Sequence, residues 1–361
     1  MKLKILLLVS GLLAIPPQII GQDFSISWVF NSNSKTSSLS VSNNFNYIAF
    51  RSYVPDNQGV VTNYINILSS SGQLLGKYTI DRKGWEYLHN VSVTNNGDII
   101  ATTELGWDTW VRKISTTGRT IWNTKVFDGF SAIDCISITQ NAEYICLTGK
   151  NKVFLFNGSG SKIWEKAYGN DESAFFQEAE ISDDGNLIIF VDPLISSSDQ
   201  KGEGMIYAIN SSGKVLWNRN CASRNNLKHF ALNKSNKKIA IVVYNMTSNG
   251  VDITLLDMNG NVLKNKITSV YEKLNDVAIT ESGDICAVHK DFFSNGYQLL
   301  LQSFNSTKEG YDWKYNFEPP SGFHSGFSPE VKITNDGNTI IFSNGFDILC
   351  FKKEQLEKRW R

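Results

Sequence analysis

The chain has 361 residues, of which 41% are hydrophobic and 19% are charged. This composition supplies enough apolar material for a large core and excludes a disordered chain. Lys+Arg and Asp+Glu are equal at 35 each, so the net charge is zero. That balance excludes a general nucleic-acid binder, which needs a basic surface to displace counterions.

The first 21 residues predict an export signal. Two early lysines precede an apolar stretch, and the small residue Gly21 stands before a plausible cleavage point at Gln22. An uncleaved membrane anchor is the alternative, but the stretch is shorter than the roughly 20 residues of a spanning helix, and Pro16-Pro17 interrupts it. We therefore expect a signal peptide over residues 1–21 and no stable membrane span after cleavage. The expected location is secreted, periplasmic or cell-surface.

Beyond residue 22, one unit recurs: a short apolar strand, a polar turn and a second apolar strand. The clearest copies are Val91–Ile100, Glu180–Ile189 and Val331–Ile341, each with Asn-Gly or Asp-Gly at the turn. Glycine there supplies the positive φ of a tight hairpin turn at low steric cost. Each copy therefore predicts a β-hairpin.

The turn positions mark the repeat. They span 292 residues in six intervals, which gives a period of about 49 residues. Where another residue replaces glycine, we expect the turn to be longer or of another type. The marks are Phe45, Gly97, Ala142, Gly185, Asn236, Gly283 and Gly337.

A second hairpin follows each of these. Its turn carries Ser/Asn/Thr-Gly, and a tryptophan stands four residues after the glycine at Trp122, Trp164 and Trp217. Gly76 and Lys264 occupy the tryptophan place in their own repeats. Each unit thus predicts four short antiparallel strands.

A four-stranded sheet that is apolar on both faces is buried when such sheets stack radially. We therefore predict an all-β fold, a seven-bladed β-propeller of four-stranded antiparallel blades, as one domain over residues 22–361. Trp28 and Trp360 both match the fourth-strand tryptophan. We favour closure of the ring by the N-terminal strand, because pairing the two chain ends removes two free sheet edges.

The segment Ala208–Trp217 resembles the signature of the PQQ-like propeller repeat family, although it is one residue shorter and has Asn210 at the acidic position. The repeat also looks like the WD-type repeats of exported proteins. The resemblance implies a propeller fold shared by quinone dehydrogenases, outer-membrane assembly scaffolds and surface proteins. The dehydrogenases would carry adjacent cysteines and an acidic calcium site, and this chain has no adjacent cysteine pair.

Polar residues precede the first strand of most repeats, where the strands of a propeller converge on the channel mouth. Their carboxylates and imidazole predict a site for a cation or a polar ligand, since hard cations favour oxygen ligands. The alternative is that strand ends are polar because they meet solvent. The aligned positions are Ser38, Asn90, Cys135, Glu178, His229, Asp276 and Glu330, and the candidate ligand-binding residues are Asn90, Glu178, His229, Asp276 and Glu330.

Aromatic residues gather in the loops expected on the same face. Exposed rings there would form a surface for stacking on sugars or docking a protein. The alternative is that the loops fold back and bury the rings. The candidates are Trp85, Trp107, Trp110 and Phe323.

The sequence contains no recognisable catalytic motif. We therefore predict an exported, non-catalytic scaffold that binds a protein or polysaccharide partner, and we expect no cofactor. The alternative is a propeller enzyme with a site at the channel mouth. It would be a quinone-dependent oxidoreductase or a carbohydrate-active hydrolase or lyase.

Overall fold

The computed structural model describes most of the propeller. The predicted signal peptide lies outside the described residues. The described residues are 24–55, 61–80, 86–127, 133–168, 176, 178–192, 203–223, 227–245, 250–268, 273–290, 297–302, 313–317 and 329–353.

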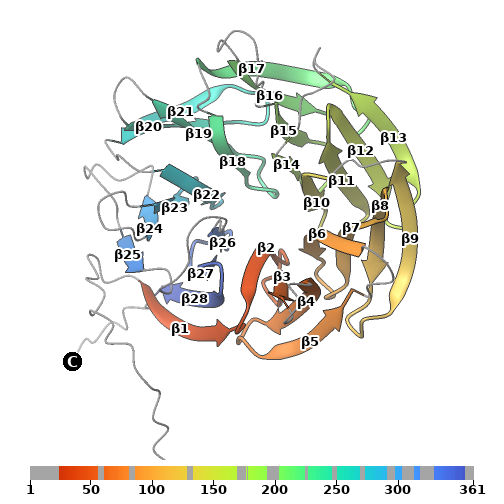
Figure 1. Ribbon diagram of the computed structural model, residues 1–361. Coiled ribbons are helices and arrows are strands. Elements are labelled where there is room, and N and C mark those ends of the chain that lie inside the picture. The colour runs from red at the N-terminus through yellow and green to blue at the C-terminus, as the bar shows by residue number, and fades with distance from the viewer. Residues whose placement is uncertain are drawn as a thin grey trace, which may run out of the picture.

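The described residues form 28 strands in seven four-stranded antiparallel sheets, arranged as the blades of a ring (Figure 1). The predicted fold is therefore confirmed. No helix in this part of the chain is long and apolar enough to cross a bilayer.

The first four blades follow the chain from the inside of the ring to the outside. Blade 1 contains β2 (Lys35–Val41), β3 (Tyr47–Pro55), β4 (Val61–Ser69) and β5 (Leu74–Thr79). Blade 2 contains β6 (Glu86–Val93), β7 (Ile99–Leu105), β8 (Asp108–Ile114) and β9 (Thr120–Phe127). Blade 3 contains β10 (Cys135–Ile138), β11 (Tyr144–Gly149), β12 (Lys152–Asn157) and β13 (Lys162–Ala167). Blade 4 contains β14 (Glu178–Ile181), β15 (Ile188–Asp192), β16 (Glu203–Ile209) and β17 (Val215–Ser223).

The last three blades complete the ring, and the seventh combines the two ends of the chain. Blade 5 contains β18 (Leu227–Leu232), β19 (Ile239–Asn245), β20 (Gly250–Leu256) and β21 (Val262–Thr268). Blade 6 contains β22 (Lys273–Ile279), β23 (Ile285–Lys290), β24 (Tyr297–Gln302) and β25 (Trp313–Phe317). Blade 7 contains β26 (Glu330–Ile333), β27 (Thr339–Ser343), β28 (Asp347–Lys353) and β1 (Phe24–Asn31).

The N-terminal strand closes the ring as predicted. β1 is the outer strand of blade 7 and pairs antiparallel with β28, from Phe24 opposite Lys353 to Asn31 opposite Asp347. The first and the last described strands therefore belong to one sheet. Their pairing satisfies backbone groups of β28 that would otherwise form a free sheet edge.

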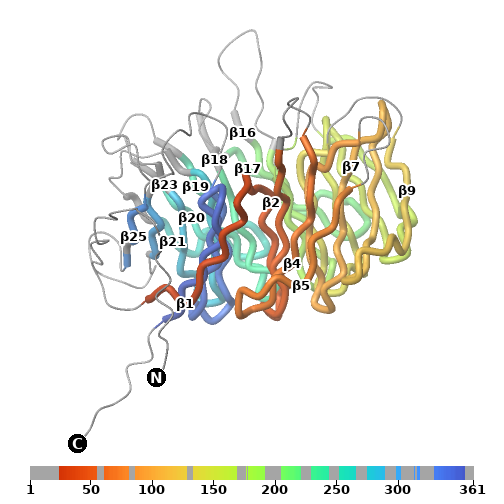
Figure 2. The backbone as a smooth tube through the Cα atoms, turned by 60° about the horizontal axis from the view of Figure 1, so that its bottom comes forward, coloured from red at the N-terminus to blue at the C-terminus, as the bar shows by residue number. Residues whose placement is uncertain are grey.

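The ring has two different faces, visible from the side in Figure 2. We call one the turn face, because the tight turns joining the first and second strands and the third and fourth strands lie there. We call the other the loop face. Connections between the second and third strands, and between consecutive blades, begin and end on the loop face. The inner strands therefore begin at the loop face and run toward the turn face.

Side chains that alternate along each strand fill the spaces between blades. In β3, Ile48 and Phe50 pack toward blade 7, whereas Ala49 packs toward blade 2. Seven hydrophobic clusters occupy the seven interfaces between neighbouring blades in this way. Because both faces of each sheet are buried, the period-2 pattern appears in the sequence as short, almost continuous apolar runs.

Six of the seven predicted first-hairpin turns share one geometry, with a residue at positive φ whose N–H bonds three residues back. Gly97 has a φ of 85° and donates to the Thr94 carbonyl at 3.0 Å. Phe45 and Ala142 take the same conformation, with φ of 56° and 55°, so the prediction that their turns differ is wrong. Both side chains pack into interface clusters, which offsets the cost of the left-handed backbone, about 1–2 kcal/mol.

The seventh turn is longer, as the missing glycine predicts. Lys237, one residue after the expected mark at Asn236, has a φ of 57° and donates to the Asn233 carbonyl, four residues back, at 2.8 Å.

Tryptophans on the outer strands of four blades each bond to the following blade, in a contact that we call the latch. The Trp122 indole N–H donates to the Gly158 carbonyl in the outer turn of blade 3 at 3.0 Å, and its ring lies against Gly160 in that turn. Trp28, Trp164 and Trp217 make the same kind of bond to the outer turn of the following blade, at 2.7 to 3.0 Å. The Ser/Asn/Thr-Gly turn and the tryptophan of the repeat are therefore two halves of one contact between blades.

This contact predicts that Gly160→Ala destabilises the ring. A Cβ at residue 160 would lie 2.7 Å from the Trp122 ring, on a backbone with a φ of 83°. Strain and overpacking together are expected to cost about 2–4 kcal/mol. Urea denaturation measures this loss. The matched control is Gly106→Ala, where φ is 65° and no atom lies within 4 Å, and where only the backbone cost of about 1 kcal/mol is expected. Equal losses at the two positions would contradict the latch.

Candidate functional site

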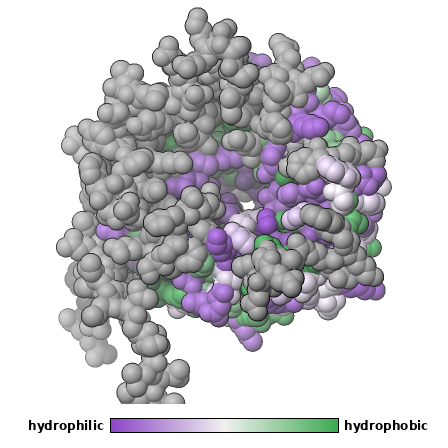
Figure 3. All heavy atoms as spheres, viewed as in Figure 1, coloured by the Kyte–Doolittle hydropathy of each residue, from purple (hydrophilic) through white to green (hydrophobic). Residues whose placement is uncertain are grey.

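The inner strands of the blades enclose a channel along the axis of the ring. A cavity of about 350 Å³ lies in this channel, lined by residues of all seven inner strands and of their turns. Figure 3 looks onto the loop face and shows hydrophilic residues around the central opening. The volume is at the lower end of the range for small-molecule sites. The channel is therefore the first candidate site.

The predicted rim residues lie at the loop-face end of the channel, but their side chains bond to the neighbouring blade. The Ser38 hydroxyl accepts a hydrogen bond from the Val91 N–H at 2.8 Å. The Asn90 amide donates to the Ile133 carbonyl at 3.0 Å. In both pairs the side chain belongs to one blade and the backbone group to the next.

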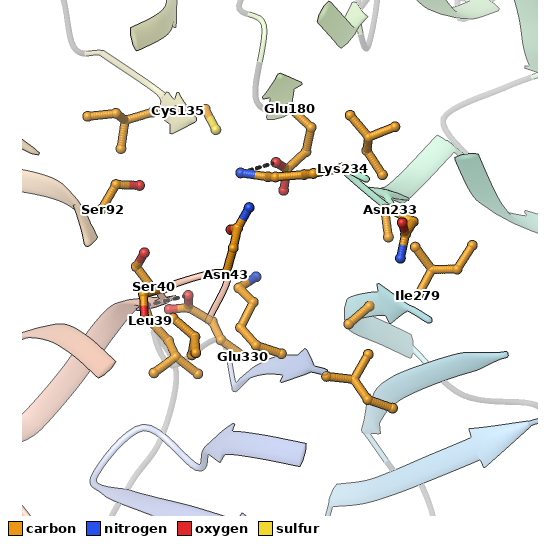
Figure 4. Close-up of a pocket in the computed structure, with 18 of the residues that line it drawn as sticks. Leu39, Ser40, Asn43, Ser92, Cys135, Glu180, Asn233, Lys234, Ile279 and Glu330 are labelled. Carbon is orange, nitrogen blue, oxygen red and sulfur yellow. Dashed lines mark hydrogen bonds and ion pairs between the residues drawn. The ribbon is translucent and has the colours of Figure 1, made fainter. Parts of the chain in front are cut away.

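Rim residues of other blades also bond through a side chain to the backbone of the following blade. The Cys135 thiol donates to the Ala179 carbonyl at 3.4 Å. The Glu330 carboxylate accepts from the Leu39 N–H at 2.7 Å, which joins blade 7 to blade 1 (Figure 4). The ring is therefore closed on the inside by a carboxylate as well as on the outside by β1.

Two further carboxylates complete the pattern. Asp276 accepts from the Val331 N–H at 2.8 Å, and Glu178 accepts from the Phe230 N–H at 3.1 Å. His229 pairs through Nδ1 with the other oxygen of Glu178. Its side chain thus bonds back to blade 4.

Six of the seven rim residues therefore use a side chain to bond the backbone of the following blade. This role differs from both roles weighed in the sequence analysis, a ligand site and a solvated strand end. Each such bond contributes about 1 kcal/mol, or roughly 1.5–3 kcal/mol where the acceptor is charged. We call these contacts the inner ties. Whether Asn90, Glu178, His229, Asp276 and Glu330 also bind a ligand stays a prediction.

A lysine inside the channel balances these carboxylates. Lys332 lies two residues after Glu330 on β26, and its ammonium is 3.7 Å from Asp276. Burial by itself would lower the pKa of Lys332, but Asp276, Glu330 and Glu180 raise it above its ordinary value. Lys332 is therefore held in the charged state among the carboxylates of the channel.

Glu330 is a tying carboxylate whose titration is changed by burial. Burial raises the pKa of this carboxyl to about 7, and Asp276 acts in the same direction, whereas Lys332 and the bond from Leu39 act against it. The neutral and the ionised carboxyl can both accept the Leu39 N–H. The tie therefore persists on protonation.

A second ring of polar residues lies one step deeper, and the sequence analysis did not single it out. Ser137 donates to Glu180 at 2.9 Å, and Lys234 pairs with the same carboxylate at 3.1 Å (Figure 4). The signal was present in the repeat, because polar residues recur two positions after the rim residue at Ser40, Ser92, Ser137, Glu180 and Lys332. Period-2 alternation places both sets on the same face of each inner strand, toward the following blade, as the bonds between Ser38 and Val91 and between Ser40 and Val93 show.

Turn residues reach across the channel at the turn face. Asn43 of blade 1 bonds to Asp183 of blade 4, and Gln140 donates to the same carboxylate at 3.0 Å. Asn233 of blade 5 donates to Asn335 of blade 7 at 3.1 Å. The cavity is therefore narrowed at the turn face by hydrogen bonds between blades that are not neighbours.

The chemistry of the rim is that of a structural element. Burial raises the pKa of the Cys135 thiol to about 12, so this cysteine is protonated and unreactive at neutral pH. Burial also raises the pKa of Asp134 to about 6. Among the described residues, no three His, Cys, Asp or Glu side chains are grouped so that they could hold a metal ion.

The four aromatic candidates differ in exposure and in whether the structure describes them. Trp107 lies at the tip of the β7–β8 hairpin on the loop face and is 74% exposed. Trp110 lies within β8, not in a loop, and is half-buried. Trp85 and Phe323 lie outside the described residues.

Comparisons with known proteins identify the fold and no family. No protein-family model and no curated protein sequence match the chain. Among solved structures, the chain is similar to one described as the propeller of Dos1, with a TM-score of 0.57 and 11% sequence identity. That match covers 91% of this chain and 95% of the other. At this identity the likeness shows the β-propeller alone, and the PQQ-like and WD-type resemblances stay predictions.

The position of Glu330 predicts a pH-dependent stability. Its pKa of about 7 in the fold exceeds the unfolded value of about 4.3, so ionisation costs more in the folded protein. The contribution of Glu330 to the free energy of unfolding should therefore be highest below about pH 4.3. It should fall as the pH rises from there to about 7. Glu330→Gln keeps an acceptor for the Leu39 N–H and removes this dependence.

Urea denaturation of both proteins at pH 5 and pH 7.5 measures the effect. The wild type should lose more stability over this interval than Glu330→Gln, because other titrating groups contribute equally to both. Identical losses would show that Glu330 titrates as an exposed carboxyl does.

Proposed function

We propose that this protein is an exported, non-catalytic β-propeller that binds a partner through its loop face, with Trp107 as an anchor. The observation that carries the proposal is the exposure of this indole. A tryptophan 74% exposed at a hairpin tip leaves a large apolar surface in water. Such rings are typical of the residues that dominate binding energy at protein interfaces.

The surroundings of Trp107 support a docking surface. Leu105 on the same hairpin and Tyr87 on the neighbouring strand β6 are each 37% exposed. The hairpin is held by regular pairing of β7 with β8, and Leu105 lies opposite Asp108 at its tip. A short, well-paired hairpin presents its side chains at little entropic cost on binding.

The inner ties favour a scaffold over an enzyme. The alternative enzyme would use carboxylates such as Glu178, Asp276 and Glu330 at the channel mouth. These carboxylates accept backbone N–H groups of the next blade, and removing one would weaken the ring as well as the chemistry. Because the polar residues of the rim hold the ring together, a role in binding a partner through the outer surface fits the protein better than catalysis at the rim.

The N-terminal sequence supports an exported location, with residues 1–21 as the signal peptide and Gln22 as the first mature residue. The latch tryptophans Trp122, Trp164 and Trp217 support a relation to the PQQ-like repeat, because they are the residues on which the resemblance rests. Both statements belong to the proposal. A protein or a polysaccharide is the expected partner.

Trp107→Ala tests the proposal. Immobilised wild-type protein and variant are exposed to the extracellular and envelope fraction of the source cells, and the retained material is quantified. Loss of an anchoring tryptophan is expected to cost at least 2 kcal/mol, a fall of about thirtyfold in affinity. The melting temperature should stay unchanged, because the side chain is exposed.

Leu75→Ala is the matched control. Leu75 is 49% exposed on the outer strand of blade 1, near the turn face, and its loss should leave partner binding unchanged. Equal retention of the partner by Trp107→Ala and the wild type would exclude the loop-face anchor.

A further inference from the structure

An arginine between blades 1 and 2 has unused hydrogen-bonding capacity. Arg51 lies on β3, opposite Ser37 and Ile65 in its sheet, at the height of the channel rim. Its Nε donates to the Asn63 side chain at 3.1 Å, and its guanidinium lies 5.4 Å from the centroid of the Tyr53 ring. These contacts fix the side chain and leave the two terminal nitrogens unbonded within the described part of the chain.

No carboxylate of the described residues offsets the charge of Arg51. Burial lowers the pKa of this guanidinium from its usual value, and Tyr53 alone acts against that change. Arg112, in the same space between the blades, shows the usual arrangement. It pairs with Glu86 and donates to Thr103 at 2.9 Å. Within the described part of the chain, an anion therefore accompanies Arg112 and none accompanies Arg51.

A second positive group lies beside Arg51, and next to it stands a histidine that is neutral at pH 7. The ammonium of Lys35 is 5.8 Å from the centroid of the same Tyr53 ring. Burial chiefly lowers the pKa of His89, and the positive charge of Arg51 contributes to that change, whereas the bond to Glu104 at 3.2 Å opposes it. Glu86 and Glu104 are bonded to Arg112 and His89, so Arg51 and Lys35 make this end of the space between the blades positive.

The geometry fits a planar anion. An arginine held by Nε and lying on an aromatic ring keeps its terminal N–H groups in one plane, and these match the two oxygens of a carboxylate. We propose that the space between blades 1 and 2 at the loop face binds a carboxylate of the partner, and that the terminal nitrogens of Arg51 hold it. The inference rests on the proposed function and gives the partner a chemical character.

The position of this site favours an acidic protein segment as the source of the carboxylate. β6 carries His89 beside Arg51, and two residues earlier it carries the exposed Tyr87. β6 also pairs with β7, which leads into the hairpin that carries Trp107. One segment could therefore place an acidic side chain on Arg51 and an apolar side chain on the tip of the hairpin. Tryptophan and arginine together are typical of the energetic centre of a protein interface.

The test uses a probe with one carboxylate and its neutral isostere. N-acetylglutamate amide and N-acetylglutamine amide are each added at about 50 mM to the full-length protein, at equal ionic strength, and the melting temperature is measured. For a dissociation constant near 10 mM, the acidic probe should raise the melting temperature by about 2 °C and the neutral probe should not. A shift with inorganic phosphate and none with the acidic probe would overturn the carboxylate assignment.

Arg51→Gln should abolish the shift, and Arg51→Lys should reduce it, because an ammonium cannot bond both oxygens in one plane. Arg119→Gln, at an exposed outer turn, is the matched control and should keep the full shift. Without probe, Arg51→Gln should melt at or above the wild-type temperature, since it removes a half-buried charge that no described carboxylate pairs. A lower melting temperature together with a retained shift would show that Arg51 is structural.

Trp107→Ala separates this site from the proposed function. It should keep the response to the acidic probe, because Arg51 holds the carboxylate without the indole. Loss of partner binding in Trp107→Ala with no probe response in the wild type would refute the carboxylate site and leave the anchor standing. A probe response in the wild type with unimpaired partner binding in Trp107→Ala would refute the Trp107 anchor and leave the carboxylate site standing.

Discussion

The ring depends on bonds that leave one blade and end on the next. At the channel, side chains such as Asn90 and Glu330 bond to backbone groups of the following inner strand. At the circumference, indoles such as Trp122 bond to carbonyls of the following outer turn. The hydrophobic effect brings blades together without fixing their angle, because it has no direction. Bonds near the channel and bonds at the circumference together fix the angle between neighbouring blades, and seven such angles complete the ring.

In this arrangement, the polar residues of the channel mainly hold the blades together, whereas polar and apolar groups of the loop face remain for binding a partner. The acidic channel is balanced by Lys332 and narrowed by contacts such as Asn43 with Asp183, so much of its bonding capacity is used within the protein. The loop face differs, because it carries the exposed Trp107 and the terminal nitrogens of Arg51, which bond to no other described residue. We expect recognition where bonding capacity and apolar surface are left over.

The hairpin turns show how tertiary packing overrides local preference. Phe45 and Ala142 adopt the left-handed backbone that Gly97 adopts at the same place in its repeat. The local cost is small in comparison with the pairing of two strands and the burial of a side chain between blades. A repeat can therefore lose its most characteristic residue and keep its geometry, and a sequence pattern based on glycine underestimates how regular the ring is.

The sequence by itself determined the number of blades and the four strands in each, because these follow from the hydrophobic period and the turn residues. It left Trp28 and Trp360 as alternatives for the strand that closes the ring and favoured the N-terminal strand, because pairing the two chain ends removes free sheet edges. It also placed Asn90, Glu178, Asp276 and Glu330 at one end of the channel. Only the tertiary structure decided what those side chains do, since their partners lie about 50 residues away on another blade. The same holds for Arg51, because the absence of a carboxylate beside it among the described residues is a property of two packed blades and of no single strand.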